Sequence, residues 1–312
     1  MMKKTDVNRI ALMLGTLALA LGFFTARAVA AGPGNVTVTV TAVGKKDTTP
    51  PAISKDDVQV YVSKERKQIA DWRRGEKLYL AVVIDDSLDV GVASQWSDLK
   101  AFFAAQPDST YISVGYARNG AVTLAQDFTN NHELAAKALR IPTGGGAFAS
   151  PYLSILDLMK RWPASGDRRS ILLISSGVDY FRGGGFGPKS PDLDPAIERA
   201  QKQNINIWSI YAPDAGHRSH GFFRTSTAQS NLGQLSDETG AESYSLGTGM
   251  PVTFKPWLDE IGVHLGNQYL LTFNASGQKK GRFERLRVHT ELPNTEFMAP
   301  AQAYLPPATA VQ

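Results

Sequence analysis

The sequence predicts an α/β domain whose mostly parallel sheet carries helices on both faces, with a β segment on either side of it in the chain. LYLAVVI (78–84) and SILLIS (170–175) are apolar on both faces, as central strands of a parallel sheet are. INIWSIYA (205–212) is a third strand, and helical patterns separate the three. Strands that alternate with helices indicate crossover connections and hence a parallel sheet.

The segments between these strands have the patterns of covering helices. After the first strand, apolar residues recur on one helical face, at Val92, Trp96, Leu99, Phe102 and Phe103. Further helices are expected over 132–139, 151–161, 195–204, 227–239 and 253–265. TYISVGYA and AVTLAQ, joined by RNG, are expected to form a hairpin, and AESYSL a short strand.

The two flanking segments are predicted to be β structure. NVTVTVTAV (35–43) and VQVYV (58–62) alternate apolar and polar residues, and a polar turn, SKERK, precedes a returning strand. Near the other end, QYLLTFNA and RFERLRVHT have the pattern of a hairpin. Neither segment is large enough to be stable alone, so we expect them to pack as one discontinuous sheet domain. The expected boundaries are 31–75, 76–266 and 267–312.

The first thirty residues have the order of a secretory signal peptide (1–30). Lys3, Lys4 and Arg9 precede an apolar run, and small residues follow at Ala28 and Ala30. The run is short for a membrane span, although an uncleaved anchor is the alternative. We therefore expect an exported protein, periplasmic or secreted, that begins at Ala31.

Composition excludes several classes of function. The leader holds four basic residues and one acidic residue, so the mature chain carries about +1 rather than the +4 of the whole chain. No other segment has a dense Lys/Arg run, which argues against nucleic-acid binding. No second apolar stretch approaches the length that a membrane span requires. The absence of cysteine excludes disulfides, thiol nucleophiles and thiolate metal sites.

Polar residues gather where two of the predicted central strands end. Asp85, Ser87 and Asp89 follow the first strand, and the run 175–179, which contains Ser176 and Asp179, follows the second. Ligands of α/β sheets bind at the carboxyl ends of strands, so both groups are candidates for one site. The alternative is that Ser87 or Asp89 only caps the helix that starts near residue 90.

At these residues the chain resembles a known family. VVIDDSLD, TGGGAFASPYLSI and LLISSGVD are similar, in order and context, to the three metal-site motifs of von Willebrand factor type A domains. The flanks ISKDDVQVYVSKERKQI and NQYLLTFNASGQKKGRFERLRVHT resemble those of the bacterial exported VWFA-related family. The resemblance covers residues 35–308. It implies a Rossmann-like fold and protein binding through a metal-ion-dependent adhesion site.

The resemblance also implies where the adhesion site departs from the family pattern. Asp85 and Ser87 match the first motif, whereas Asp89 stands where a second serine is usual. Gly146 falls at the threonine position, with Thr143 nearby, and Ser176 replaces an aspartate, although Asp179 follows it. The candidate ligands of a Mg²⁺, Mn²⁺ or Ca²⁺ ion are therefore Asp85, Ser87, Asp89, Ser176 and Asp179, in an altered site. The alternative, which these departures favour, is a non-functional metal site whose loops bind a protein without metal. Backbone carbonyls of the glycine-rich loops at 144–146 and 183–187 are further possible ligands.

The loop DAGHRSHGFF (214–223) follows the third central strand and carries a second set of candidates. The loop and the residue after it carry aromatic and basic side chains of the kind that anchor protein interfaces. These are Arg218, Phe222, Phe223 and Arg224. The alternative is that both phenylalanines pack under the loop. Asp214, His217 and His220 are three residues apart, a spacing that a transition-metal site could use, but a solvated polar loop is the preferred interpretation.

The sequence lacks residues that the two enzymatic hypotheses require. An aspartyl phosphatase would use Asp85 as nucleophile with an acid two residues later, where the chain has Ser87. A serine hydrolase would need a Gly-x-Ser-x-Gly turn, which is absent. The sequence thus predicts a non-enzymatic protein-binding or adhesion module of the envelope or secreted fraction. The alternatives are a metal-dependent phosphatase-like hydrolase and a purely structural envelope protein.

Overall fold

The computed structural model describes residues 34–45, 50–163, 166–180, 189–216, 221–275 and 280–308. The predicted signal peptide, the loop at 183–187 and the residues Arg218, His217 and His220 lie outside the described residues. No helix in the described ranges is long and apolar enough to cross a membrane.

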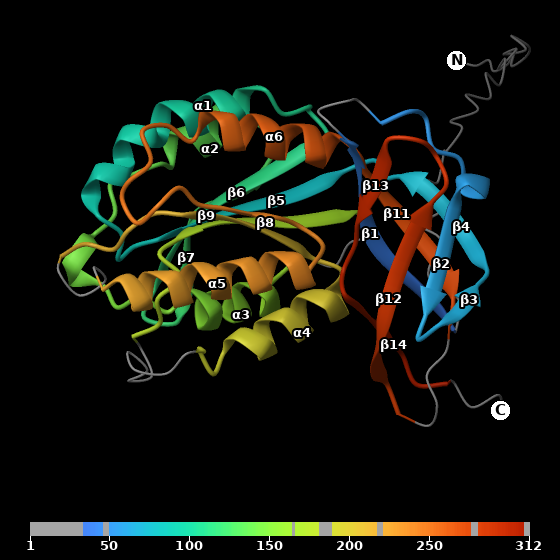
Figure 1. Ribbon diagram of the computed structural model, residues 1–312. Helices are drawn as coiled ribbons and strands as arrows, with labels where there is room; N and C mark the ends of the chain where they lie inside the picture. Colours follow the sequence, from blue (N-terminus) through green and yellow to red (C-terminus); the bar gives the residue numbers. More distant parts are fainter. Residues whose placement is uncertain are drawn as a thin grey trace, which may run out of the picture. The chain divides into compact units, whose positions relative to one another are not determined.

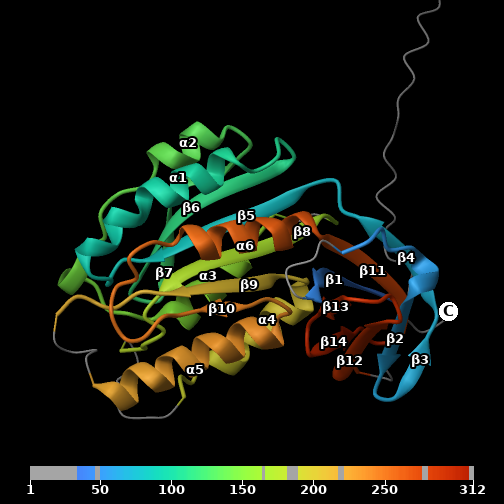
Figure 2. The ribbon, with the colours of Figure 1, turned by 45° about the horizontal axis from the view of Figure 1, so that its top comes forward.

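The centre of the α/β part is a six-stranded sheet in the order β10-β9-β8-β5-β6-β7 (Figure 1; β10 is labelled in Figure 2). Every neighbouring pair is parallel except the β6–β7 hairpin at one edge. The predicted mostly parallel sheet is therefore confirmed. Its strands are β5 (Leu78–Asp85), β6 (Thr110–Arg118), β7 (Ala121–Thr129), β8 (Arg168–Ser175), β9 (Asn206–Tyr211) and β10 (Ser243–Tyr244).

Helices cover both faces of this sheet, with α1, α2 and α6 on one face and α3, α4 and α5 on the other (Figures 1 and 2). Alternate residues of β5 divide between two cores: Leu80 and Val82 pack with α1 and α6, whereas Ala81 and Val83 pack with α3 and α4. The helices are α1 (Trp96–Ala104), α2 (His132–Lys137), α3 (Pro151–Lys160), α4 (Leu193–Gln203), α5 (Phe222–Glu238) and α6 (Lys255–Gly266).

Three short 3₁₀ segments complete the described helical structure: η2 (Lys55–Asp57), η3 (Val90–Gln95) and η4 (Gly144–Gly146). Two of the sequence expectations differ here. The glycines at 144–146 form a short helical turn rather than a flexible loop. Helix α5 begins at Phe222, five residues before the predicted start, because Thr225, Ala228 and Leu232 place one face on the sheet. Serine and threonine are weak helix formers, so packing rather than propensity extends this helix.

The two flanking segments form a pair of four-stranded antiparallel sheets. Their orders are β13-β1-β11-β4 and β14-β12-β2-β3, so each sheet mixes strands from both ends of the chain. One apolar cluster, which includes Val40, Val60, Leu271 and Val288, lies between the two sheets. The strands are β1 (Asn35–Gly44), β2 (Val58–Val62), β3 (Glu65–Lys67), β4 (Ile69–Arg74), β11 (Gln268–Asn274), β12 (Arg282–Thr290), β13 (Thr295–Met298) and β14 (Gln302–Leu305).

The hairpin expected from β11 and β12 does not form. β11 pairs with β1 and β4, and β12 pairs with β2 and β14, in the other sheet. The physical reason is burial: β11 is buried at nearly every position, so it needs neighbours on both edges and cover on both faces. The expected polar turn SKERK also contains a short strand, β3.

Candidate functional site

Three neighbouring strands of the central sheet deliver polar side chains to one edge. β5 ends at Asp85, β8 ends at Ser175, and the segment after β9 carries Asp214. Because these strands are adjacent and parallel, their carboxyl ends lie together. Backbone hydrogen bonds tie the connecting segments: Ala215 N donates to Ser87 O over 3.0 Å, and Asp89 N donates to Pro213 O over 2.9 Å.

Asp85 is the innermost residue of this site, with no exposed surface. Its Oδ1 accepts hydrogen bonds from the Ser87 backbone N at 3.1 Å and the Ser87 hydroxyl at 2.8 Å. Its Oδ2 accepts a third from the Ser175 hydroxyl at 3.0 Å. Both carboxylate oxygens are therefore occupied by groups from its own turn and from the neighbouring strand.

Asp214 lies on the other side of the same serine. The Ser87 hydroxyl is 3.0 Å from Asp214 Oδ1 as well as 2.8 Å from Asp85 Oδ1. A hydroxyl has one proton, so it can donate to only one of the two carboxylates at a time. The second oxygen of Asp214, Oδ2, is buried and has no hydrogen-bond partner among the described residues. The Ser87 hydroxyl therefore cannot satisfy both carboxylates at once.

Electrostatics at the pair follow from burial and like charge. Burial is the largest influence that raises the pKa of Asp85; the hydrogen bonds from Ser87 and Ser175 oppose it, and the charge of Asp86 adds to it. Burial also raises the pKa of Asp214, followed by the charge of Asp85, and the hydroxyls of Ser176 and Ser87 oppose this. Two buried carboxyl groups this close need a proton or a cation between them.

Asp86 belongs to a separate network. Its carboxylate accepts two hydrogen bonds from the Arg140 guanidinium, at 2.7 and 3.1 Å, and two from Thr143, from N at 2.9 Å and Oγ1 at 2.8 Å. Burial alone would raise the pKa of Asp86, but the bonds from Arg140 and Thr143 outweigh it and lower the pKa. Arg140 therefore neutralises Asp86, and the hydroxyl of Thr143 is likewise directed to Asp86.

The structure brings together some of the sequence-predicted ligands and places others elsewhere. Asp85 and Ser87 lie in the site, and Ser176 lies beside Asp214. Asp89 accepts a hydrogen bond from Gly91 N at 2.8 Å and caps η3, which is the alternative role weighed from sequence. Asp179 accepts one from the Ser190 hydroxyl at 2.5 Å.

Asp214 is the central residue that the sequence analysis left out of the metal-ligand set, having grouped it with His217 and His220. A signal for it was present, because it follows a predicted central strand by two residues and so falls at the same carboxyl edge. The structure fixes it there with an isolated β-bridge to Leu88. The carbonyl of Gly146, another suggested ligand, accepts a hydrogen bond from Arg118 Nη2 at 3.0 Å.

Comparison with known proteins finds solved structures of similar arrangement but no matching family model and no matching curated protein. One is an aerotolerance-related membrane protein from Bacteroides fragilis NCTC 9343, at 12% identity and a TM-score of 0.43, covering 61% of this chain and 98% of that one. Another is the SpRpn10 VWA domain, with the same identity, TM-score and coverages. A third is the vWF domain of the type V pili tip protein Mfa5 from Porphyromonas gingivalis, at 13% identity, a TM-score of 0.43, and 62% and 97% coverage.

The order of the central sheet, with its single antiparallel edge hairpin and its two helical layers, agrees with the fold that the sequence motifs implied. The α/β part has a von Willebrand factor type A-like fold. In this type A-like domain the Asp85–Ser87–Asp214 cluster lies at the carboxyl edge of the sheet, where ligands of such sheets bind.

The aromatic residues predicted to contact a partner lie at the first turn of α5 in the type A-like domain, not in a loop. Phe222 and Phe223 are 72% and 85% exposed, and their rings meet edge to face at 5.8 Å. The alternative that they pack under the loop is therefore excluded. Arg224 Nη1 donates to the Tyr180 hydroxyl at 3.2 Å. Helix α5 follows β9, so this exposed pair begins at the same edge as the carboxylates.

Proposed function

We propose that the protein is a non-enzymatic, exported protein-binding module whose type A-like domain holds one divalent cation between Asp85 and Asp214. The observation that carries this is the single Ser87 hydroxyl shared by two buried carboxylates. A cation between them would supply the missing positive charge and use the unpartnered Oδ2 of Asp214.

The donor set suits a hard cation. Two carboxylates and the hydroxyls of Ser87 and Ser176 are all oxygen ligands, which Mg²⁺, Mn²⁺ and Ca²⁺ prefer. Asp85 and Asp214 would hold the ion, with the serine hydroxyls completing its protein ligands. When bound, such an ion offers an open position to a carboxylate of the partner, as the family resemblance implies. Asp89 and Asp179, with their own hydrogen bonds, are not needed for this arrangement.

The geometry favours binding over catalysis. A nucleophilic aspartate must present a carboxylate oxygen to its substrate. Asp85 has no exposed surface, and serine groups occupy both of its oxygens. We therefore propose that Asp85 is a ligand and not a nucleophile, and that the phosphatase-like alternative does not apply.

The partner's apolar contact is proposed to be the exposed pair Phe222 and Phe223. Large aromatic side chains at the centre of an interface supply much of the binding free energy, and an exposed adjacent pair is unusual on a surface with no partner. Arg224 would add a charged contact, held in position by Tyr180. A partner that docks here would reach the cation and the aromatic pair together.

The cation proposal is tested by calorimetric titration of Mg²⁺, Mn²⁺ and Ca²⁺ into the protein without residues 1–30. We expect one site per molecule, and at least about tenfold weaker binding in Asp214→Asn, because a carboxylate ligand is lost. The matched control is Asp89→Asn, which keeps the capping geometry and should bind as the wild type does. No heat with any of the three ions at millimolar concentration would overturn the proposal.

The partner proposal is tested by affinity capture from envelope extracts with wild-type protein and with Phe222→Ser/Phe223→Ser. A stoichiometric partner should be captured by the wild type and lost from the double variant. Val263→Ser, which changes another exposed apolar residue on α6, is the control. A purely structural protein would show no partner that depends on the aromatic pair.

A further inference from the structure

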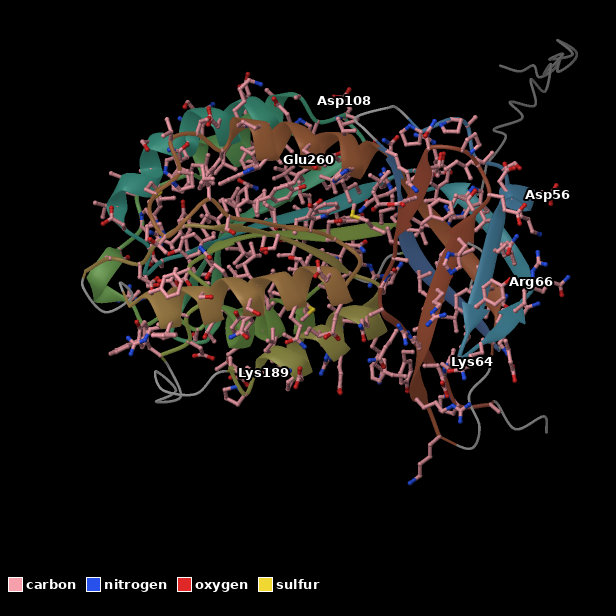
Figure 3. All side chains as sticks on the ribbon, viewed as in Figure 1. Asp56, Lys64, Arg66, Asp108, Lys189 and Glu260 are labelled. Atoms are coloured by element: carbon pink, nitrogen blue, oxygen red, sulfur yellow. The ribbon has the colours of Figure 1, made fainter. Side chains whose placement is uncertain are left out.

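A second group of potential metal ligands lies at the other side of the type A-like domain, between α6 and the edge strand β10. It consists of Glu242, Glu260 and His264, each of which offers one ligand atom, and these three atoms lie within 4.8 Å of one another. None of the three was singled out from the sequence as a ligand. Glu260 projects from α6 in Figure 3.

His264 is the best-defined member of this group. It is 6% exposed, and its ring stacks on Trp208 of β9 at 5.4 Å with an interplanar angle of 27°. Its Nδ1 is buried and has no hydrogen-bond partner among the described residues. Buried polar nitrogens are almost always partnered, so an unpartnered one requires an explanation. A structural core histidine would instead donate to a nearby carbonyl or hydroxyl.

Two independent elements hold the other two groups beside this ring. Glu260 and His264 are four residues apart on α6, which places them on one face of the helix. Glu242 comes directly before β10. Its carbonyl accepts a hydrogen bond from Ser209 N at 3.1 Å, and its side chain accepts one from the Tyr244 hydroxyl at 3.4 Å. The backbone and the side chain of Glu242 are thus both anchored.

The convergence of two carboxylates on a neutral imidazole is unfavourable without a cation, because the carboxylates repel each other. The geometry points to a zinc-class transition-metal site made by Glu242, Glu260 and His264. One imidazole nitrogen and two carboxylate oxygens are ligands that Zn²⁺ accepts, with water in the fourth position. Ligands about 2.0–2.2 Å from a tetrahedral ion are roughly 3.5 Å apart, so the three atoms lie within a small side-chain adjustment of this geometry. Glu260 is the exposed member of the three.

The ion would connect α6 to the last strand of the sheet. β10 has only two residues, and β9 is its one strand neighbour in the described sheet. A metal shared by Glu242 and the two α6 residues would fix this short strand to the helix that covers it. The role is structural and independent of the carboxyl-edge site.

The test is titration of Zn²⁺, and of Co²⁺ followed by its visible absorption, in the full chain. The background carries Asp85→Asn, His217→Gln and His220→Gln, so neither the strand-end carboxylates nor the histidine loop contributes. We expect one equivalent of each ion to bind, with Co²⁺ giving the absorption of a tetrahedral nitrogen–oxygen site. Glu260→Gln should weaken both by at least about tenfold, and His264→Gln should abolish the Co²⁺ spectrum.

The matched control is Asp259→Asn, the adjacent acid on α6, whose carboxylate pairs with Lys255 at 2.6 Å. It should bind both ions as the background does. Since His264 is buried and its variant can fail to fold, the surface variant Glu260→Gln decides the matter alone. Equal affinities in Glu260→Gln and Asp259→Asn, or no stoichiometric binding in the background, would overturn the inference.

Discussion

At the scale of single residues, the carboxylates at the carboxyl edge of the sheet lower the stability of the free protein but suit the binding of a cation. Asp85 and Asp214 are buried, alike in charge, and share one Ser87 proton. Groups held in such unfavourable surroundings are typical of binding sites, where a ligand relieves the strain. The free protein should therefore gain stability when one of these charges is removed, even though it loses its ligand.

We expect Asp214→Asn to raise the free energy of unfolding by roughly 1–2 kcal/mol when divalent cations are chelated. The amide is neutral and supplies donors to a site that lacks them. Urea denaturation with EDTA measures this. Asp89→Asn, at an exposed cap where asparagine serves as well as aspartate, should change stability little. A lower free energy of unfolding in Asp214→Asn would contradict the claim that Asp85 and Asp214 repel each other in the metal-free protein.

A second residue-scale prediction concerns Gly177, which follows Ser176 at a φ of +71°. A Cβ there would lie 2.6 Å from Ala228 O and 2.8 Å from Leu232 of α5. Gly177→Ala should cost roughly 2 kcal/mol or more, through both the backbone conformation and the clash. Gly233→Ala, inside α5 with open space around it, should instead stabilise by about 0.5–1 kcal/mol. Thermal unfolding of the two variants should shift in opposite directions.

At the scale of elements, the long strands and helices were predictable because each has a strong local pattern. β5 and β8 are apolar on both faces, and α1 carries its apolar residues at helical spacing. The pairing partners of the strands were not predictable, because pairing between residues 195 to 239 positions apart leaves no local trace; the pairs that β11 and β12 make with the N-terminal strands are the example. The site followed the same rule: strand ends located Asp85 and Ser87, and Asp214 also follows a predicted central strand, but only the strand order places it beside Ser87.

The connection that leads from α2 to η4 is held by Asp86, and this gives a prediction at the same scale. Asp86→Asn should lower the free energy of unfolding by about 1.5–3 kcal/mol. The substitution weakens the charged hydrogen bonds from Arg140, and its NH₂ group replaces a buried carboxylate oxygen that accepts hydrogen bonds. Asp157→Asn, which weakens the more exposed pair with Arg161, should cost at most about 1 kcal/mol. Urea denaturation of both variants checks the difference.

At the scale of the whole described chain, the two sheets of the β part are made from both ends of the sequence, and they contact the type A-like domain. Thr39 N donates to Asn204 Oδ1 at 2.6 Å, and Ala301 N donates to Glu238 O at 3.1 Å. Within the N-terminal segment only β2 and β3 pair with each other, whereas β1 and β4 have all their described strand neighbours in the C-terminal segment.

Removal of residues 267–312 should expose the remaining N-terminal strands to protease, because β1 loses both of its neighbours, β11 and β13. Limited proteolysis with mass spectrometry should find early cuts within 34–75 in this variant and not in the full chain. A chain that ends at Leu305 keeps β14 and should resist as the full chain does. Equal resistance after removal of 267–312 would show that the N-terminal segment folds alone.

The pairing of β1 with β11 also determines when β1 can complete its sheet during synthesis. Asn35 pairs with Asn274, so β1 must wait for a partner that the ribosome makes 239 residues later. During that interval the Val/Thr-rich β1 has no partner and is open to wrong pairing with other chains. The nascent protein is thus open to wrong pairing until β11, which begins 233 residues after β1, has emerged. A chaperone that shields the early strand would be of most use in that period.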